Sequence, residues 1–164
     1  MASLSSAPLS VARLVRALDD ALNNTSLILL LEIGGVSMLF PGDAQIENWR
    51  YTLDRLDDDA KLRAKLTVID LYKVGHHGSR NATPRSLHRL WTQRPPDAPR
   101  ITALMSTRAG VHGTTPATAV PRATLVEALR QVADVYSTED LPDGQSFLEV
   151  VADAPGGPFR IVQT

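Results

Sequence analysis

Two short polar motifs follow apolar segments and carry side chains that bind metal ions. Asp43 comes after the apolar run 36–40, and His76 and His77 come after a second apolar run, 67–74. One carboxylate and two imidazoles suit Zn²⁺, Mn²⁺ or Fe²⁺, which accept nitrogen and oxygen ligands. The chain contains no cysteine, so disulfides and thiolate metal sites are excluded.

Each motif also has an ordinary structural explanation when it is taken alone. A Gly-Asp pair after a strand is usually a turn, and adjacent histidines also occur in plain polar loops. Their joint placement favours chemistry, because a strand-helix-strand crossover joins parallel strands that end at the same edge of a sheet. If the two apolar runs are neighbouring strands, Asp43 and the histidines meet at the edge where α/β sheets bind ligands. The spacing leaves open whether His76 or His77 is the ligand, and Ser79 would orient it or touch substrate.

The elements that position these motifs follow from apolar periodicity. Gly34-Gly35 predicts a hairpin, and its nearly continuous apolar strands predict that both of its faces are covered. The run Asp57-Asp58-Asp59 is expected to cap a helix, not to bind metal. The pattern predicts an α/β protein with helices at 9–23, 45–65 (in two parts), 84–92 and 121–132, and strands at 26–33, 36–40, 67–74, 101–105, 134–137, 145–151 and 158–163.

Composition indicates one globular domain spanning residues 1–164. The chain is 43% hydrophobic and 21% charged, and its net charge of −1 gives no overall attraction to nucleic acid or to an anionic membrane. Its longest apolar run, 27–31, is far below the roughly 20 residues of a membrane span. The N-terminus lacks the features of a signal peptide, so we expect a cytoplasmic protein without a membrane partner.

Two segments carry a resemblance to a known family. Residues 29–44 (LLLEIGGVSMLFPGDA) and 70–79 (DLYKVGHHGS) resemble the C-terminal half of a metallo-β-lactamase-fold hydrolase, and are similar to the hydrolase domain of the competence DNA-uptake channel family. The resemblance covers about residues 20–140 and implies half of an αββα sandwich, a mixed sheet flanked by helices. It implies that Asp43 bridges two metal ions and that His76 binds one of them, with His77 as the second choice. The residues expected around substrate or behind the ligands are Ser79, Arg80, Asn81 and His112.

The resemblance implies metal-dependent hydrolysis of a phosphodiester or another ester, in a small molecule or a nucleic acid, by a metal-bound hydroxide. Zinc is the expected metal, with manganese or iron as alternatives. The chain lacks the family's His-x-His-x-Asp-His motif and its third histidine motif, so we expect the isolated chain to bind metal weakly or not at all. The missing N-terminal half of the fold, or a second copy of this chain, would be the partner.

An alternative remains open: a catalytically inactive remnant or interaction module that dimerises or packs on a partner. Half of a sandwich would expose an apolar sheet face, which favours association. In that case Lys73, Arg80 and Arg108, near the same edge, would bind an anion without turnover.

Overall fold

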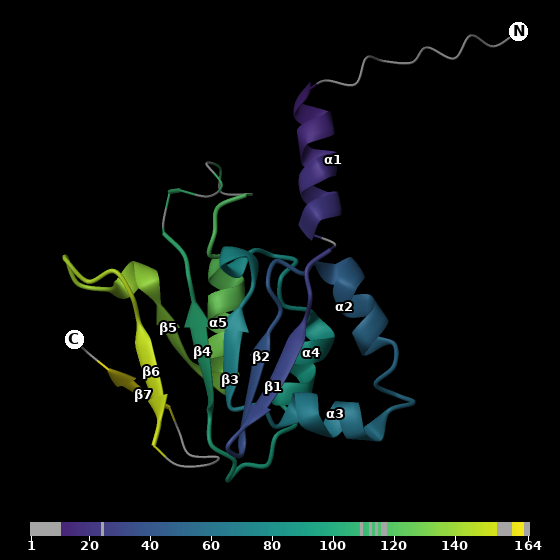
Figure 1. Cartoon of the computed structure of the whole chain (residues 1–164), viewed down its shortest axis with the longest axis vertical. Coiled ribbons are helices and arrows are strands. Elements are labelled where there is room, and N and C mark those ends of the chain that lie inside the picture. Colours follow the sequence, from purple (N-terminus) through teal and green to yellow (C-terminus); the bar gives the residue numbers. More distant parts are fainter. Residues whose placement is uncertain are drawn as a thin grey trace, which may run out of the picture.

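The core of the molecule is a mixed five-stranded sheet with the strand order β1-β2-β3-β4-β5 (Figure 1). The computed structural model describes residues 11–23, 25–108, 110–111, 113, 115, 118–153 and 159–162. β1 and β2 form an antiparallel hairpin, and β3, β4 and β5 run parallel to β2. The strands are β1 (Leu29–Ile33), β2 (Val36–Phe40), β3 (Leu71–Val74), β4 (Ile101–Met105) and β5 (Ala133–Ser137), with a separate hairpin of β6 (Glu149–Ala152) and β7 (Phe159–Val162). The prediction of an α/β protein is confirmed.

Four helices cover one face of this sheet. Their apolar side chains form a single buried cluster with Leu39, Tyr72 and Ala103, which lie side by side on β2, β3 and β4. The Tyr72 ring lies 4.9 Å from the ring of Trp91, centroid to centroid. The helices are α2 (Ile46–Leu53), α3 (Ala60–Thr67), α4 (Arg85–Trp91) and α5 (Ala123–Val132), whereas α1 (Val11–Asn23) extends beyond the sheet (Figure 1). No helix in the described part of the chain is long and apolar enough to cross a membrane.

Most predicted elements are present with shifted ends. β1 begins at Leu29 instead of residue 26, and β3 begins at Leu71 because Thr67 is the last residue of α3. The Asp59 side chain accepts a hydrogen bond of 2.8 Å from the Leu62 backbone N–H and so caps α3. The capping role expected for the aspartate run is therefore confirmed at this residue.

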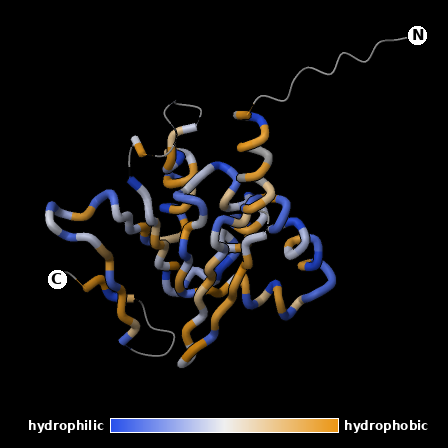
Figure 2. Tube along the Cα trace, turned by 45° about the horizontal axis from the view of Figure 1, so that its top comes forward, coloured by the Kyte–Doolittle hydropathy of each residue, from blue (hydrophilic) through white to orange (hydrophobic). Residues whose placement is uncertain are grey.

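The prediction that both faces of the β1–β2 hairpin are covered is wrong. Leu29, Leu31 and Ile33 are 39–63% exposed, and the antiparallel register places them on the same face as Met38 and Phe40. All four covering helices lie on the other face of the hairpin. The alternate residues Leu30 and Leu39 pack in the helix-covered core, and Glu32 forms an ion pair with Lys65 of α3. In Figure 2 this hairpin is largely coloured hydrophobic. This face is therefore open along β1, whereas on β2 Met38 and Phe40 are half-buried and Val36 is buried.

Candidate functional site

The two predicted motifs lie against each other at one edge of the sheet. β2 pairs with β3 in parallel, so the aspartate loop (residues 41–45) and the histidine turn (residues 75–79) leave neighbouring strand ends. A Cβ atom on Gly75 would lie 2.6 Å from the Gly42 carbonyl oxygen and 3.1 Å from Cγ of Pro41. Only glycine permits this approach, because any larger residue would push the two backbones apart. The predicted juxtaposition of the motifs at one edge is present.

The histidine turn has an unusual backbone. His76 and His77 have φ angles of 43° and 52°, and Gly78 follows with 76°. Hydrogen bonds of 2.9 Å from Gly78 N to the Gly75 carbonyl and from Ser79 N to the His76 carbonyl close the turn. A left-handed conformation at a residue other than glycine costs on the order of 1–3 kcal/mol, and such strain concentrates at functional sites.

Contacts from two other segments hold this turn in place. A Cβ on Gly78 would lie 2.9 Å from Sδ of Met105 and 3.1 Å from Cβ of Pro121, so the end of β4 and the segment before α5 both press on it. The Gly78 carbonyl also accepts a hydrogen bond of 3.0 Å from the Arg122 backbone N–H. Tertiary packing therefore supports the strained turn that the local hydrogen bonds close.

A polar neighbour contacts Nδ1 of each imidazole. Nδ1 of His77 lies 2.9 Å from the Ser106 carbonyl oxygen. Because a carbonyl only accepts, Nδ1 carries the proton and Nε2 carries the lone pair of the neutral ring. Nδ1 of His76 lies 3.2 Å from Oγ of Ser79, and the two imidazole centroids are 6.4 Å apart. Ser79 thus contacts a histidine, as the sequence predicts, whereas the contact to Ser106 was not foreseen.

These donors do not complete a metal site by themselves. Within the part of the chain that the structure describes, no three His, Cys, Asp or Glu side chains are placed so that they could hold a metal ion. A catalytic zinc site normally uses three protein ligands and an open position. Asp43, His76 and His77 therefore do not fit a complete catalytic metal centre without further ligands.

Lys73 lies near Asp43 and gives the edge a mixed electrostatic character. Its side chain is half-buried on the sheet face opposite the helices, and Nζ donates a hydrogen bond of 3.3 Å to the Val74 carbonyl. Burial lowers the pKa of the Lys73 ammonium, and the negative charge of Asp43 acts in the opposite direction.

The remaining predicted site residues are Arg80, Asn81 and His112. Arg80 and Asn81 are exposed in the loop that follows the turn, and His112 lies outside the described residues. His88, for which a surface position is the ordinary expectation, is half-buried instead, with Nε2 2.9 Å from the Ala128 carbonyl oxygen. This contact links α4 to α5, so His88 has a structural role.

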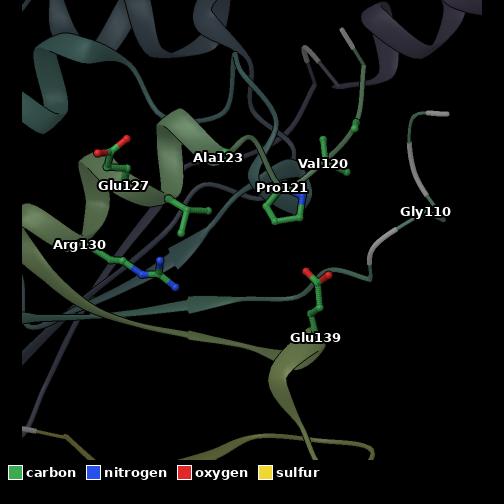
Figure 3. Close-up of a pocket in the computed structure, with 9 residues that line it drawn as sticks. Gly110, Val120, Pro121, Ala123, Glu127, Arg130 and Glu139 are labelled. Atoms are coloured by element: carbon green, nitrogen blue, oxygen red, sulfur yellow. The ribbon is translucent and has the colours of Figure 1, made fainter. Parts of the chain in front are cut away.

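A hollow of about 420 Å³ lies beside the histidine turn (Figure 3). Its wall includes Pro121, which packs on the turn, and the charged residues Glu127, Arg130 and Glu139. No residue of the aspartate loop or of the histidine turn lines it. The hollow is therefore a candidate binding surface beside the edge, but Asp43, His76 and His77 are not part of its wall.

Comparison of the chain with protein-family models, curated proteins and solved structures finds no match. Its function is therefore inferred from the residues at the edge of the sheet.

Proposed function

We propose that this chain supplies part of the metal centre of a hydrolase of the metallo-β-lactamase fold, which acts on a phosphodiester or another ester. One observation carries the proposal: the aspartate loop and the strained histidine turn touch at the edge where parallel strands end. Ligand sites of α/β sheets lie at such edges. The donors are a carboxylate and imidazoles, which suit zinc.

The roles in this proposal are divided among the chain's own residues. Asp43 contributes a carboxylate, and His76 contributes an imidazole that Ser79 orients. His77 is the alternative ligand, and its contact to the Ser106 carbonyl makes Nε2 the binding atom. The remaining ligands would come from the missing N-terminal half of the fold or from a second copy of this chain.

The proposal is tested by titrating the purified chain with Co²⁺, a spectroscopic substitute for zinc. We expect weak saturable binding that falls at least about tenfold in Asp43→Asn and in His76→Ala, as expected when a ligand or its support is removed. Asp97→Asn, an exposed aspartate in the loop before β4, is the matched control and should bind like the parent chain. Equal Co²⁺ affinity in Asp43→Asn and the parent chain would refute the role of Asp43.

A second candidate function, an interaction module, is favoured by a different observation. The helix α1 carries an apolar stripe that is 51–78% exposed, formed by Val11, Leu14, Val15, Leu18 and Leu22. The open face of the β1–β2 hairpin is a second exposed apolar surface on the same chain. Figure 1 shows α1 pointing away from its own sheet. Two unpartnered apolar surfaces on one chain favour a dimer in which each α1 packs on the hairpin of the other copy.

The sizes of these two surfaces match. A helix of 13 residues is about 20 Å long, and a strand of 5 residues is about 17 Å long. Each of the eight exposed side chains removes roughly 60–100 Å² from water on burial, so two reciprocal contacts remove about 1,000–1,600 Å². That area reaches the size of stable protein interfaces.

Sedimentation velocity tests this second candidate. We expect a dimer for the parent chain and monomers for Leu14→Glu/Leu18→Glu and for Leu31→Lys. Arg13→Glu lies on the opposite side of α1 from the apolar stripe and should leave the dimer intact. A monomeric parent chain at concentrations on the order of 100 μM, well above the Kd expected for an interface of this size, would rule out self-association as the function.

A further inference from the structure

A cavity of about 250 Å³ lies on the sheet face opposite the helices, beside the histidine turn. Lys73, Leu104 and Tyr136 form its floor and are direct neighbours across β3, β4 and β5. Phe147 and Leu148, from the segment before β6, also line it, and Phe147 is 57% exposed. Ser106 lines the cavity and also accepts the hydrogen bond from His77, so the cavity adjoins the candidate metal edge.

The polar groups that line the cavity include unused hydrogen-bond donors. The Lys73 ammonium has three N–H groups, and among the described residues only the Val74 carbonyl accepts from it, at 3.3 Å. Ser106, Tyr136 and Ser146 also line the cavity and carry hydroxyl groups, with Tyr136 half-buried and the two serines exposed. The Thr138 hydroxyl donates to the Thr107 carbonyl at 2.8 Å and is already used.

We propose that this cavity binds a phosphate group through the Lys73 ammonium and the hydroxyls of Ser106, Tyr136 and Ser146. One cation and three hydroxyl donors around a small, partly apolar space match the oxygens of a phosphate. The inference rests on the proposed hydrolase function, since it assigns the substrate's phosphate to a place beside His77. It also stands as an anion site when no metal is bound.

Asp43 makes the inference distinguishable from the metal proposal. Its negative charge acts on Lys73 and repels an anion held there. Replacing Asp43 by Asn should therefore strengthen phosphate binding while it weakens Co²⁺ binding. Metal binding at Asp43 would neutralise the same charge, so metal and phosphate should increase each other's affinity by the same factor.

The test is a calorimetric titration of the metal-free chain with inorganic phosphate, with sodium acetate of equal ionic strength in a parallel arm. We expect a Kd on the order of 1 mM for phosphate, and a loss of about 10–100-fold in Lys73→Met, as for a charge-assisted hydrogen bond. Lys61→Met removes an exposed lysine of α3 and is the matched control, which should bind like the parent chain. Tyr136→Phe removes one hydroxyl and should weaken binding by about threefold, at the lower end for a neutral hydrogen bond.

Three results would overturn the inference. Unchanged phosphate affinity in both Lys73→Met and Tyr136→Phe would exclude this cavity. Acetate binding as tight as that of phosphate would exclude phosphate as the preferred group. Weaker phosphate binding in Asp43→Asn would contradict the electrostatic reasoning. If phosphate binds as expected and Co²⁺ does not depend on Asp43, the anion cavity stands and the metal proposal fails.

Discussion

The left-handed histidine turn leads to a prediction about stability that has the opposite sign from the usual one. We compare alanine and glycine at His76 and at His77. At an ordinary position glycine is less stable than alanine by about 0.5–1 kcal/mol, because it loses more backbone entropy on folding. At φ angles of 43° and 52° an alanine keeps a steric penalty of roughly 1–2 kcal/mol that glycine escapes.

The expected result is that the glycine variant is the more stable one at both positions. Subtracting the two ranges leaves a net advantage for glycine of up to about 1.5 kcal/mol at each histidine. The lost imidazole contacts cancel in the comparison, because alanine and glycine lack them equally. His77→Ala and His77→Gly both lose the contact to the Ser106 carbonyl, and the His76 variants both lose the contact to Ser79.

Equilibrium unfolding in urea measures the free energies, with the midpoint and the slope compared between the variants. Ser79, with a φ of −68°, is the matched control, and Ser79→Ala should be more stable there than Ser79→Gly. If alanine equals or exceeds glycine at both histidines, the turn is not left-handed in solution. The assignment of strain to this site would then be withdrawn.

Three further predictions concern the packing that holds the edge in place. Gly75→Ala should destabilise the fold by about 1–3 kcal/mol, because its methyl group would meet the Gly42 carbonyl. Gly34→Ala has open space around it and should cost only the roughly 1 kcal/mol of its left-handed φ. Thermal unfolding of both variants measures the difference. Arg94→Lys should lower the free energy of unfolding in urea by roughly 1–3 kcal/mol. The Arg94 guanidinium donates to the backbone carbonyls of Thr67, Ile69 and Pro99, and an ammonium lacks the planar fork that reaches all three. Burial raises the pKa of the Tyr72 phenol, so its contribution to stability is fully present below about pH 10. Above that pH the free energy of unfolding should fall by about 1.4 kcal/mol per pH unit. Urea unfolding curves across this range should show a smaller loss for Tyr72→Phe, and equal losses in both proteins would contradict this.

Features with local signals could be predicted from the sequence. The Gly34-Gly35 turn fixes the β1–β2 hairpin, and Asp59 caps α3 through its own side chain. The pairing of β2 with β3 followed from the order of strand, helix and strand, so the contact between the aspartate loop and the histidine turn could be predicted as well. These predictions needed only neighbouring residues and the rule for crossovers.

Features that depend on distant segments could not be predicted. The apolar run 29–33 reads the same whether one or both of its faces are covered, and only the positions of α2–α5 decide that one face is open. The left-handed histidines have no local signal except Gly78, because Met105 and Pro121 help to hold the conformation. The orientation of His77 likewise depends on where β4 ends, since the Ser106 carbonyl oxygen accepts a hydrogen bond from its Nδ1–H.

The start of β1 connects the candidate metal edge to α1, the helix that would pack on the hairpin of a second copy. Leu29 pairs with Phe40, so α1 joins the sheet at the edge where the aspartate loop begins. A Cβ on Gly42 would lie 3.6 Å from Cβ of Ser26, in the segment between α1 and β1. A second copy held by α1 would therefore approach the same edge, where Asp43, His76 and His77 form an incomplete set of ligands within the described part of the chain.

Mixing two defective variants tests the reciprocal arrangement. Leu14→Glu/Leu18→Glu has a damaged helix and an intact hairpin face, whereas Leu31→Lys has the reverse. Together they can form one of the two contacts, roughly 500–800 Å², which is below the size of a stable interface and should give weak, concentration-dependent association. Each variant alone should remain monomeric at the same total concentration in sedimentation velocity. A dimer that contacts helix to helix or hairpin to hairpin would show no gain on mixing, and that result would exclude the exchange of α1 between copies.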